Sequence, residues 1–223
     1  MYKYLLFDAD NTLLDFDLAE KQALLETMSL SPLGFTEEIH KRYHVINDNE
    51  WKRLERGETT RDRLRIDRFS KLFDEFGLDG RLYCNEIADM YTSKLSQQGC
   101  LLPFAVEVLE NLSKKYDCYI ITNGITEVQR SRISLTPLGN YIKHSFVSQE
   151  LGWAKPSPIF FEKVLEYIGD ADKKKYLVIG DSLTSDIKGA CDSGLDSVWI
   201  SSESNPLPTY RIERLQDLYS ILD

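Results

Sequence analysis

Five short, apolar, β-rich runs are the feature that most constrains the fold of this 223-residue chain. From the second run onward, a segment of helix length separates each run from the next. Strands that alternate with helices form parallel sheets with right-handed crossovers, and runs without polar alternation are typical of strands covered on both faces. The sequence therefore predicts a doubly wound, Rossmann-like α/β sheet, with strands at residues 2–7, 116–121, 144–147, 176–179 and 197–200.

Residues 15–99, between the first two runs, have a different pattern. They contain no strand-like run, but four amphipathic segments with apolar residues at helical spacing. Four helices of this length can bury their apolar faces against one another as a separate bundle. We therefore expect an all-helical domain at residues 15–99, inserted into an α/β core formed by residues 1–14 and 100–223.

The bulk properties exclude several classes of partner. A formal net charge of −9 argues against nucleic acid, whose phosphate backbone attracts basic surfaces, although a single phosphate ester can still bind in a local pocket. No apolar segment approaches the roughly 18 residues needed to cross a membrane, and the four cysteines lack the spacing of a disulfide framework or a zinc site. We expect a cytoplasmic protein that acts on a small molecule, as a monomer or homodimer.

Polar side chains follow four of the five runs, where each strand should end. Ligands of open parallel sheets bind beyond the carboxyl ends of the strands. Each residue alone could be a turn former or a helix cap, but four groups in order favour one shared site. They are Asp8 and Asp10 after the first run, Thr122 and Asn123 after the second, Lys155 after the third, and Asp181, Ser182 and Asp186 after the fourth.

The charges of these residues are compatible with a metal and a phosphoryl group. Asp8, Asp10 and Asp181 form an acidic cluster that needs a hard cation, and Mg²⁺, with Mn²⁺ as an alternative, prefers oxygen ligands. The hydroxyl of Thr122 and the backbone amides after it could bind phosphate oxygens. Lys155 could neutralise the charge that develops on a transferring phosphoryl group.

The order of the motifs resembles the haloacid dehalogenase-like (HAD) superfamily: "DADNTL", a strand ending in "TN", then "KP", then "GDSLTSD". The resemblance spans the whole chain, and the helical insert resembles that family's C1-type cap. It implies that Asp8 is a nucleophile that forms an aspartyl-phosphate. It also implies that Asp10 protonates the leaving oxygen and then activates water.

The same resemblance assigns the remaining candidates. An acid at Asp10 favours phosphoryl transfer over dehalogenation, because the dehalogenases of the family lack an acid at that position. The family pattern places magnesium on Asp8, the Asp10 carbonyl and Asp181; phosphate on Thr122, Asn123 and Lys155; and Ser182 and Asp186 behind them, with Asp186 orienting Lys155 or a metal-bound water.

Within the family, "FDADNTLLDFD", "NEWKRLERGETTRD", "ITNG" and "GDSLTSDIKGA" look most like pyrimidine 5′-nucleotidases. The resemblance implies nucleoside monophosphates such as UMP and dTMP as substrates. Phe16, Trp51 and Arg61 are then candidates to contact the base, although Arg61 could equally pair with a neighbouring acid. A phosphosugar phosphatase or phosphoglucomutase-like enzyme is an alternative, and a non-catalytic phosphate-sensing module is a more distant one, which has no need for Asp10.

His40 and His44 lie four residues apart on a predicted helix, a spacing that can bind zinc. We identify no acidic or third ligand near them in the sequence. The two histidines are therefore interpreted as a solvated or packing pair.

Overall fold

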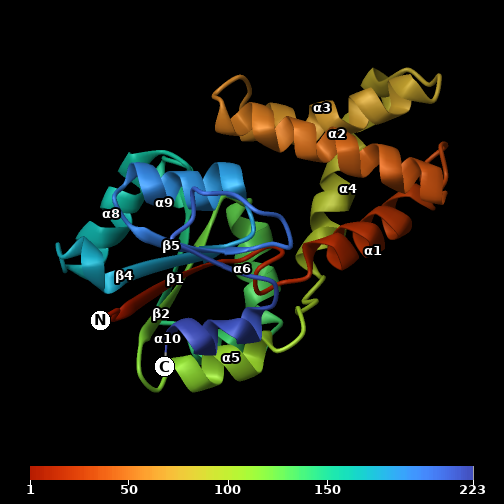
Figure 1. Ribbon diagram of the computed structural model, residues 1–223. Coiled ribbons are helices and arrows are strands. Elements are labelled where there is room, and N and C mark those ends of the chain that lie inside the picture. Colours follow the sequence, from red (N-terminus) through yellow and green to blue (C-terminus); the bar gives the residue numbers. More distant parts are fainter. Residues whose placement is uncertain (223) are drawn as a thin grey trace. The chain divides into compact units, whose positions relative to one another are not determined.

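The structure is a computed structural model and describes residues 1–222 of the chain (Figure 1). It divides into two compact units. The core unit consists of Met1–Phe16 together with the chain from Gly99 onward, and the helical unit is Asp17–Gln98.

The core unit is built on a six-stranded sheet with the order β3-β2-β1-β4-β5-β6. All neighbouring strands are parallel, so the expected doubly wound α/β architecture is confirmed. The strands are β1 (Tyr4–Asp8), β2 (Asp117–Thr122), β3 (His144–Val147), β4 (Tyr176–Gly180), β5 (Asp196–Ile200) and β6 (Tyr210–Ile212).

The sixth strand, β6, is absent from the expectation that was based on apolar runs. It is three residues long, lies at the edge of the sheet beside β5, and buries only Ile212. Tyr210 and Arg211 are exposed, so the segment has no continuous apolar pattern. An edge strand is specified by its neighbour more than by its own composition, because only one of its sides is paired.

Helices cover both faces of the sheet, as Figure 1 shows for α5 and α10 on one side and α8 and α9 on the other. The helices of the core unit are α5 (Ala105–Leu112), α6 (Thr126–Ser134), α7 (Ser148–Leu151), α8 (Pro158–Ile168), α9 (Lys188–Asp192) and α10 (Tyr219–Leu222). Short 3₁₀ turns are Pro137–Asn140, Lys173–Lys175 and Leu215–Leu218, and Leu183–Ile187 forms one turn of π-helix.

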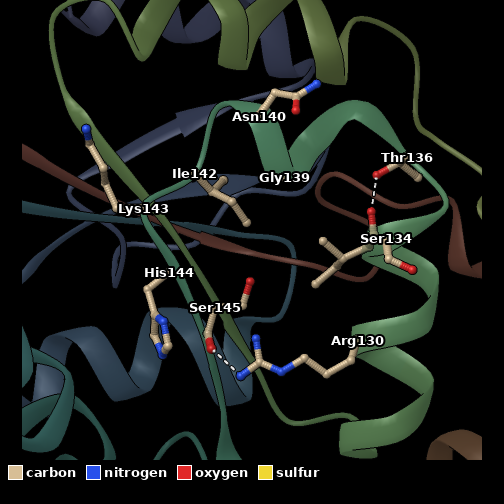
Figure 2. A pocket seen from close by; sticks show the side chains of 10 residues that line it. Arg130, Ser134, Thr136, Gly139, Asn140, Ile142, Lys143, His144 and Ser145 are labelled. Atoms are coloured by element: carbon tan, nitrogen blue, oxygen red, sulfur yellow. Dashed lines mark hydrogen bonds between the residues drawn. The ribbon is translucent and has the colours of Figure 1, made fainter.

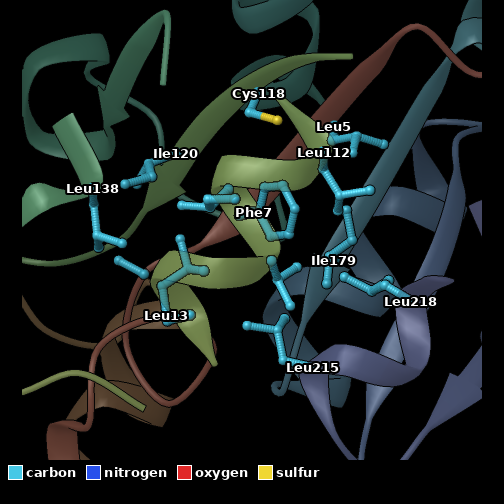
Figure 3. Packing of buried hydrophobic residues seen from close by; sticks show 14 of the residues in the cluster. Leu5, Phe7, Leu13, Leu112, Cys118, Ile120, Leu138, Ile179, Leu215 and Leu218 are labelled. Atoms are coloured by element: carbon cyan, nitrogen blue, oxygen red, sulfur yellow. The ribbon is translucent and has the colours of Figure 1, made fainter. Parts of the chain in front are cut away.

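Successive residues of β1 point into opposite layers, as strand geometry requires. Leu5 and Phe7 belong to a buried cluster with α5 and the C-terminal turns, whereas Leu6 packs in a second cluster that includes Phe160 and Phe161 of α8. Figure 3 shows Phe7 at the centre of the first cluster. β1 is thus packed between two buried hydrophobic layers near the middle of the sheet, and its carboxyl end is fixed by both of them.

The helical unit contains α1 (Phe16–Met28) from its second residue onward, α2 (Glu37–Glu55), α3 (Arg61–Glu75), a short 3₁₀ turn (Gly80–Leu82) and α4 (Cys84–Ser96). Thr36 and Thr60 begin α2 and α3, and each accepts a hydrogen bond from a backbone N–H of the first turn. The aromatic rings of Tyr43, Phe69 and Tyr91 pack together where α2, α3 and α4 meet. Residues 17–98 hold no strand, which confirms the all-helical insert.

No helix among residues 1–222 combines the length and the hydropathy that crossing a bilayer requires.

Candidate active site

Asp8 and Lys155 form a buried ion pair at the carboxyl end of the central strand. Asp8 is the last residue of β1 and is 7% exposed, and Lys155 is 1% exposed. Lys155 Nζ donates to Asp8 Oδ1 at 2.5 Å, to Asp186 Oδ1 at 2.6 Å and to the carbonyl oxygen of Ile121 at 3.0 Å. Burial alone would lower the pKa of Lys155, but Asp186 and Asp8 outweigh it and raise that pKa, so the ammonium stays charged.

Asn123 holds the backbone of Lys155 in place. Its side-chain Oδ1 accepts from Lys155 N at 2.9 Å, and its Nδ2 donates to Lys155 O at 2.8 Å. The structure therefore shows that Asn123 holds the backbone of the segment that carries Lys155, and phosphate binding by Asn123, which the family resemblance implies, stays a prediction. These two hydrogen bonds connect the loop after β2 to the segment that carries Lys155.

Three carboxylates converge beside this pair. Oxygen atoms of Asp8, Asp181 and Asp186 lie within 4.8 Å of one another, and no other group of this kind occurs in the part of the chain that the structure describes. Burial, followed by the charge of Asp186, raises the pKa of Asp181 to about 7. Burial also raises the pKa of Asp8, against the opposing effect of Lys155. One lysine does not offset three acids, so the donor set suits a divalent cation with oxygen ligands.

The chain after β4 is shaped to present these acids. Trp199 Nε1 of β5 donates to the carbonyl oxygen of Asp181 at 2.7 Å, and Asp186 Oδ2 accepts from the backbone N–H of Ser182 at 3.2 Å. Ser182 Oγ in turn accepts from Ser185 N at 3.2 Å and begins the π-helical turn. A Cβ added at Gly180 would lie 2.5 Å from Asp186 Cγ, so only glycine admits this carboxylate. Single π-helical turns are frequent at functional sites.

Thr122, the last residue of β2, is buried beside the acids. Its Oγ1 accepts from Gly124 N at 3.2 Å and from Gln129 Nε2 at 2.8 Å. With both acceptor positions used, the hydroxyl hydrogen is the group that Thr122 can offer to an anionic ligand.

Asp10 does not share the lysine with Asp8. Its Oδ1 accepts from Arg132 NH1 at 2.5 Å and its Oδ2 accepts from Gln129 Nε2 at 2.6 Å. Sequence reasoning missed both donors. The sequence does contain a pattern that could have indicated them: Gln129 and Arg132 are polar residues three positions apart, each next to an apolar residue, Val128 or Ile133, on the buried face of α6.

The candidate residues for a base are distributed over both units. Phe16 belongs to the core unit, where the guanidinium carbon of Arg132 lies 5.6 Å from the centre of its ring. Trp51 lies in α2 of the helical unit, and Arg61 is the first residue of α3. Burial lowers the pKa of Arg61.

The expectation that no acid lies near the two histidines is wrong. Glu20 Oε1 lies 2.8 Å from His44 Nδ1 and 3.9 Å from His40 Nε2. Glu20 Oε2 accepts from Asn47 Nδ2 at 2.8 Å, and Asn47 Oδ1 accepts from Arg68 NH1 at 3.0 Å. The histidines therefore belong to a hydrogen-bonded network that connects α1, α2 and α3.

A separate cavity of about 470 Å³ lies away from the acids, between α6, the turn after it and the start of β3 (Figure 2). His144 at this end of β3 pairs with Tyr119, three residues before Thr122. Arg130, which lines the cavity, donates to Ser145 O and pairs with Glu150 at 2.7 Å. The cavity is thus distinct from the strand ends that carry the site.

The comparison with protein families finds a match to a haloacid dehalogenase-like hydrolase model over residues 2–194. The chain is 40% identical to the pyrimidine 5′-nucleotidase PynA of Streptococcus pneumoniae, over 100% of this chain and 95% of that protein. It is 29% identical to the pyrimidine 5′-nucleotidase YjjG of Escherichia coli, over 99% of this chain and 98% of that protein.

The HAD-hydrolase YfnB of Bacillus subtilis is 37% identical over 100% of this chain and 96% of its own length. Its crystal structure, which is described as bound to magnesium and as revealing interdomain movement, matches this fold with a TM-score of 0.91, over 100% of this chain and 99% of that one. With these matches along its full length and the acid–lysine cluster at its strand ends, the chain belongs to the haloacid dehalogenase-like hydrolases.

Proposed function

We propose that the protein is a magnesium-dependent phosphomonoesterase in which Asp8 is the nucleophile. The observation that carries the proposal is the Asp8–Lys155 pair within the cluster of three acids at the end of β1. Lys155 keeps the Asp8 carboxylate in one orientation and brings a positive charge to the place where a phosphate ester would lie. A carboxylate fixed in this way is positioned for attack, as in enzymes whose carboxylates form covalent intermediates.

The reaction would proceed in two steps. Asp8 attacks phosphorus and the bond to the leaving oxygen breaks, with Asp10 donating a proton to that oxygen. The product of this step is an aspartyl-phosphate on Asp8. Asp10, now a base, takes a proton from water as the water attacks phosphorus; the bond between phosphorus and the Asp8 oxygen breaks, the Asp8 carboxylate is regenerated, and inorganic phosphate leaves. The Thr122 hydroxyl and the Lys155 ammonium would bind phosphate oxygens, with Asn123 holding the lysine segment.

The acids also support a proposal for the metal. Asp8 and Asp181, with the carbonyl of Asp10, would hold Mg²⁺ or Mn²⁺, and Asp186 is close enough to join them or to continue orienting Lys155. When bound, the ion would supply the positive charge that the three carboxylates and an anionic substrate together require. The magnesium in the crystal structure of YfnB supports this assignment.

We further propose pyrimidine nucleoside monophosphates as the substrates. Two relatives that match nearly the whole chain carry the name pyrimidine 5′-nucleotidase. The helical unit would act as a cap that recognises the rest of the substrate, in line with the interdomain movement described for YfnB. Phe16, Trp51 and Arg61 would contact the base. The four free cysteines support a reducing compartment such as the cytoplasm.

A phosphate-release screen with magnesium tests both levels of the proposal. We expect kcat/KM for UMP and dTMP to exceed the values for AMP, GMP and hexose phosphates. Sugar phosphates that are better substrates by tenfold or more would overturn the nucleotidase assignment and leave a phosphatase. Transfer of the phosphoryl group to a second hydroxyl without release of phosphate would instead identify a mutase.

Two variants test the residues assigned to the base. Phe16→Ala and Arg61→Ala should reduce the preference for UMP over a small generic phosphate ester by about tenfold, the value of one good contact. Arg63→Ala is the matched control, because Arg63 is exposed on the same helix as Arg61. An unchanged preference in both Phe16→Ala and Arg61→Ala would remove these residues from the base site.

A further inference from the structure

Helix α6 holds both oxygens of the Asp10 carboxylate. Arg132 NH1 donates to Oδ1 at 2.5 Å and Gln129 Nε2 donates to Oδ2 at 2.6 Å. Asp10 itself lies in the loop after β1, where 29% of its side chain is exposed. Its two partners are almost fully buried, since Arg132 is 0% exposed and Gln129 is 1% exposed.

Burying these two side chains requires compensation. An unpaired buried amide or guanidinium loses its hydration at a cost of several kcal/mol, on the order of 1–3 kcal/mol for a neutral group and more for a charged one. Both side chains direct donors to the same partly exposed carboxylate. The bonds are charge-assisted and approach from two directions, so they fix the rotation of the carboxylate as well as its position.

Gln129 also connects Asp10 to the candidate phosphate site. The same Nε2 that donates to Asp10 donates to Thr122 Oγ1 at 2.8 Å. A Cβ added at Gly124 would lie 2.5–2.7 Å from Gln129 side-chain atoms, so the glycine after Asn123 leaves the space that Gln129 occupies. One amide nitrogen thus sets the separation between the residue assigned to the leaving group and the residue assigned to the phosphate oxygens.

The side of Arg132 that faces the first loop is covered by an aromatic ring. Phe16 lies with its ring centre 5.6 Å from the guanidinium carbon, a cation–π contact. The backbone N–H of Phe16 donates to Asn11 Oδ1 at 3.0 Å, which holds the ring close to the Asp10 loop. Arg132 therefore has contacts that restrain it on both the acid side and the ring side.

We propose that Arg132 and Gln129 are positioning residues that hold the Asp10 carboxylate where it exchanges protons with the leaving group and with water. This inference rests on the proposed function, because it concerns the acid–base step of that reaction. General acid–base transfer needs heavy atoms within hydrogen-bond reach, and a displacement of about 1 Å can cost on the order of 10²-fold in rate. Neither residue needs to touch the substrate.

A purely structural role, in which the two residues only fasten α6 to the loop after β1, makes a different prediction. Loss of a structural contact would slow the turnover of every phosphate ester by a similar factor. Loss of acid positioning affects an alkyl phosphate, whose leaving oxygen needs a proton, far more than an aryl phosphate such as p-nitrophenyl phosphate, whose leaving group departs unprotonated.

The experiment compares UMP with p-nitrophenyl phosphate in Arg132→Met and Gln129→Leu, with Arg130→Met as control. Arg130 is on the same helix, but it pairs with Glu150 and lines the separate cavity. We expect kcat for UMP to fall about 100-fold in Arg132→Met and about tenfold in Gln129→Leu, with KM little changed. Hydrolysis of p-nitrophenyl phosphate should stay within about threefold of wild type, and Arg130→Met should match wild type on both substrates.

Arg132→Lys keeps the charge but cannot reproduce the guanidinium geometry, so it should recover only part of the UMP rate. If Arg132→Met does not fold, Gln129→Leu and Arg132→Lys carry the same comparison. Equal losses on the two substrates, or no loss on UMP, would overturn the inference while leaving the phosphatase proposal intact. A wild-type protein that hydrolyses neither ester would overturn the proposed function, and the inference with it.

Discussion

The core unit and the helical unit both bury charged side chains, but they balance them differently. In the helical unit each buried acid is matched: Glu20 meets His44 and Asn47, and Glu50 meets Arg53 at 2.8 Å and also Lys71. In the core unit three carboxylates gather around one ammonium, that of Lys155. The first arrangement is close to neutral and the second carries excess negative charge.

The difference distinguishes a cluster of matched ion pairs from the cluster that we propose to be reactive. The matched pairs of the helical unit bridge neighbouring helices, since Glu20 joins α1 to α2 and Glu50 joins α2 to α3. Breaking such a pair leaves a buried charge without compensation. In the core cluster, burial, followed by the charges of neighbouring acids, raises the pKa values of Asp8 and Asp181, as is common at functional sites.

The largest effect is expected from Asp8→Asn. Turnover of all phosphate esters should fall by roughly 10⁴-fold or more, because an amide is a poor nucleophile. The free energy of unfolding should be unchanged or higher, since one of the three crowded carboxylates is gone. Steady-state kinetics and urea unfolding of the same preparation measure both. A strongly destabilised or a fully active Asp8→Asn protein would contradict the contrast between the units.

Removal of divalent metal should be next in size. Exhaustive chelation should lower turnover by on the order of 10³-fold, and added Mg²⁺ should restore it, because several kcal/mol of charge stabilisation are lost. Mg²⁺ at about 100 times its Kd should also stabilise the folded wild type by about 2.7 kcal/mol, and Asp181→Asn should reduce that shift. Undiminished turnover after chelation would show that the core cluster needs no cation.

In the helical unit, loss of a buried acid should change the stability of the protein more than its activity. Glu20→Gln should lower the free energy of unfolding by about 1–3 kcal/mol, because a partly buried, charge-assisted bond to His44 is lost. Hydrolysis of p-nitrophenyl phosphate should remain close to wild type. Glu26→Gln is the matched control, since Glu26 is on the same helix but forms an exposed pair with Lys94, and its effect should stay within about 0.5 kcal/mol. Equal destabilisation by both variants would show that the bond between Glu20 and His44 stabilises the fold no more than an exposed ion pair does.

The smallest effect concerns pH. The bond to Glu20 raises the pKa of His44 to about 9, against an unperturbed value of 6.5. A pKa that is raised in the folded state stabilises the fold fully below the unfolded pKa, and that stabilisation is lost as the pH rises through the folded value. The wild type should therefore lose stability between pH 6.5 and 9 relative to Glu20→Gln. Because half of the His44 side chain is exposed, solvent weakens the effect, and parallel pH profiles for the two proteins would contradict it.

The sequence by itself determined the architecture and the position of the candidate site residues along the chain. Periodicity is a local property, so the parallel strands and the all-helical segment follow from the spacing of apolar residues. Asp8 and Thr122 are the last residues of β1 and β2, and Asp181 is the residue after β4. Their proximity could be predicted, because parallel strands bring their carboxyl ends to one edge of the sheet. The short edge strand β6 was missed, since its pairing depends on β5 and its own sequence is mostly exposed.

Only the tertiary structure decided which of these residues bind one another. Asp8 pairs with Lys155, 147 residues away, whereas Asp10 pairs with Arg132 and Gln129, at separations of 122 and 119 residues. Asn123 likewise braces the lysine segment across 32 residues. Local patterns report where a side chain lies on its own strand or helix. They do not report which donor fills the space opposite, because that choice depends on how distant elements pack and on which buried charge must be compensated.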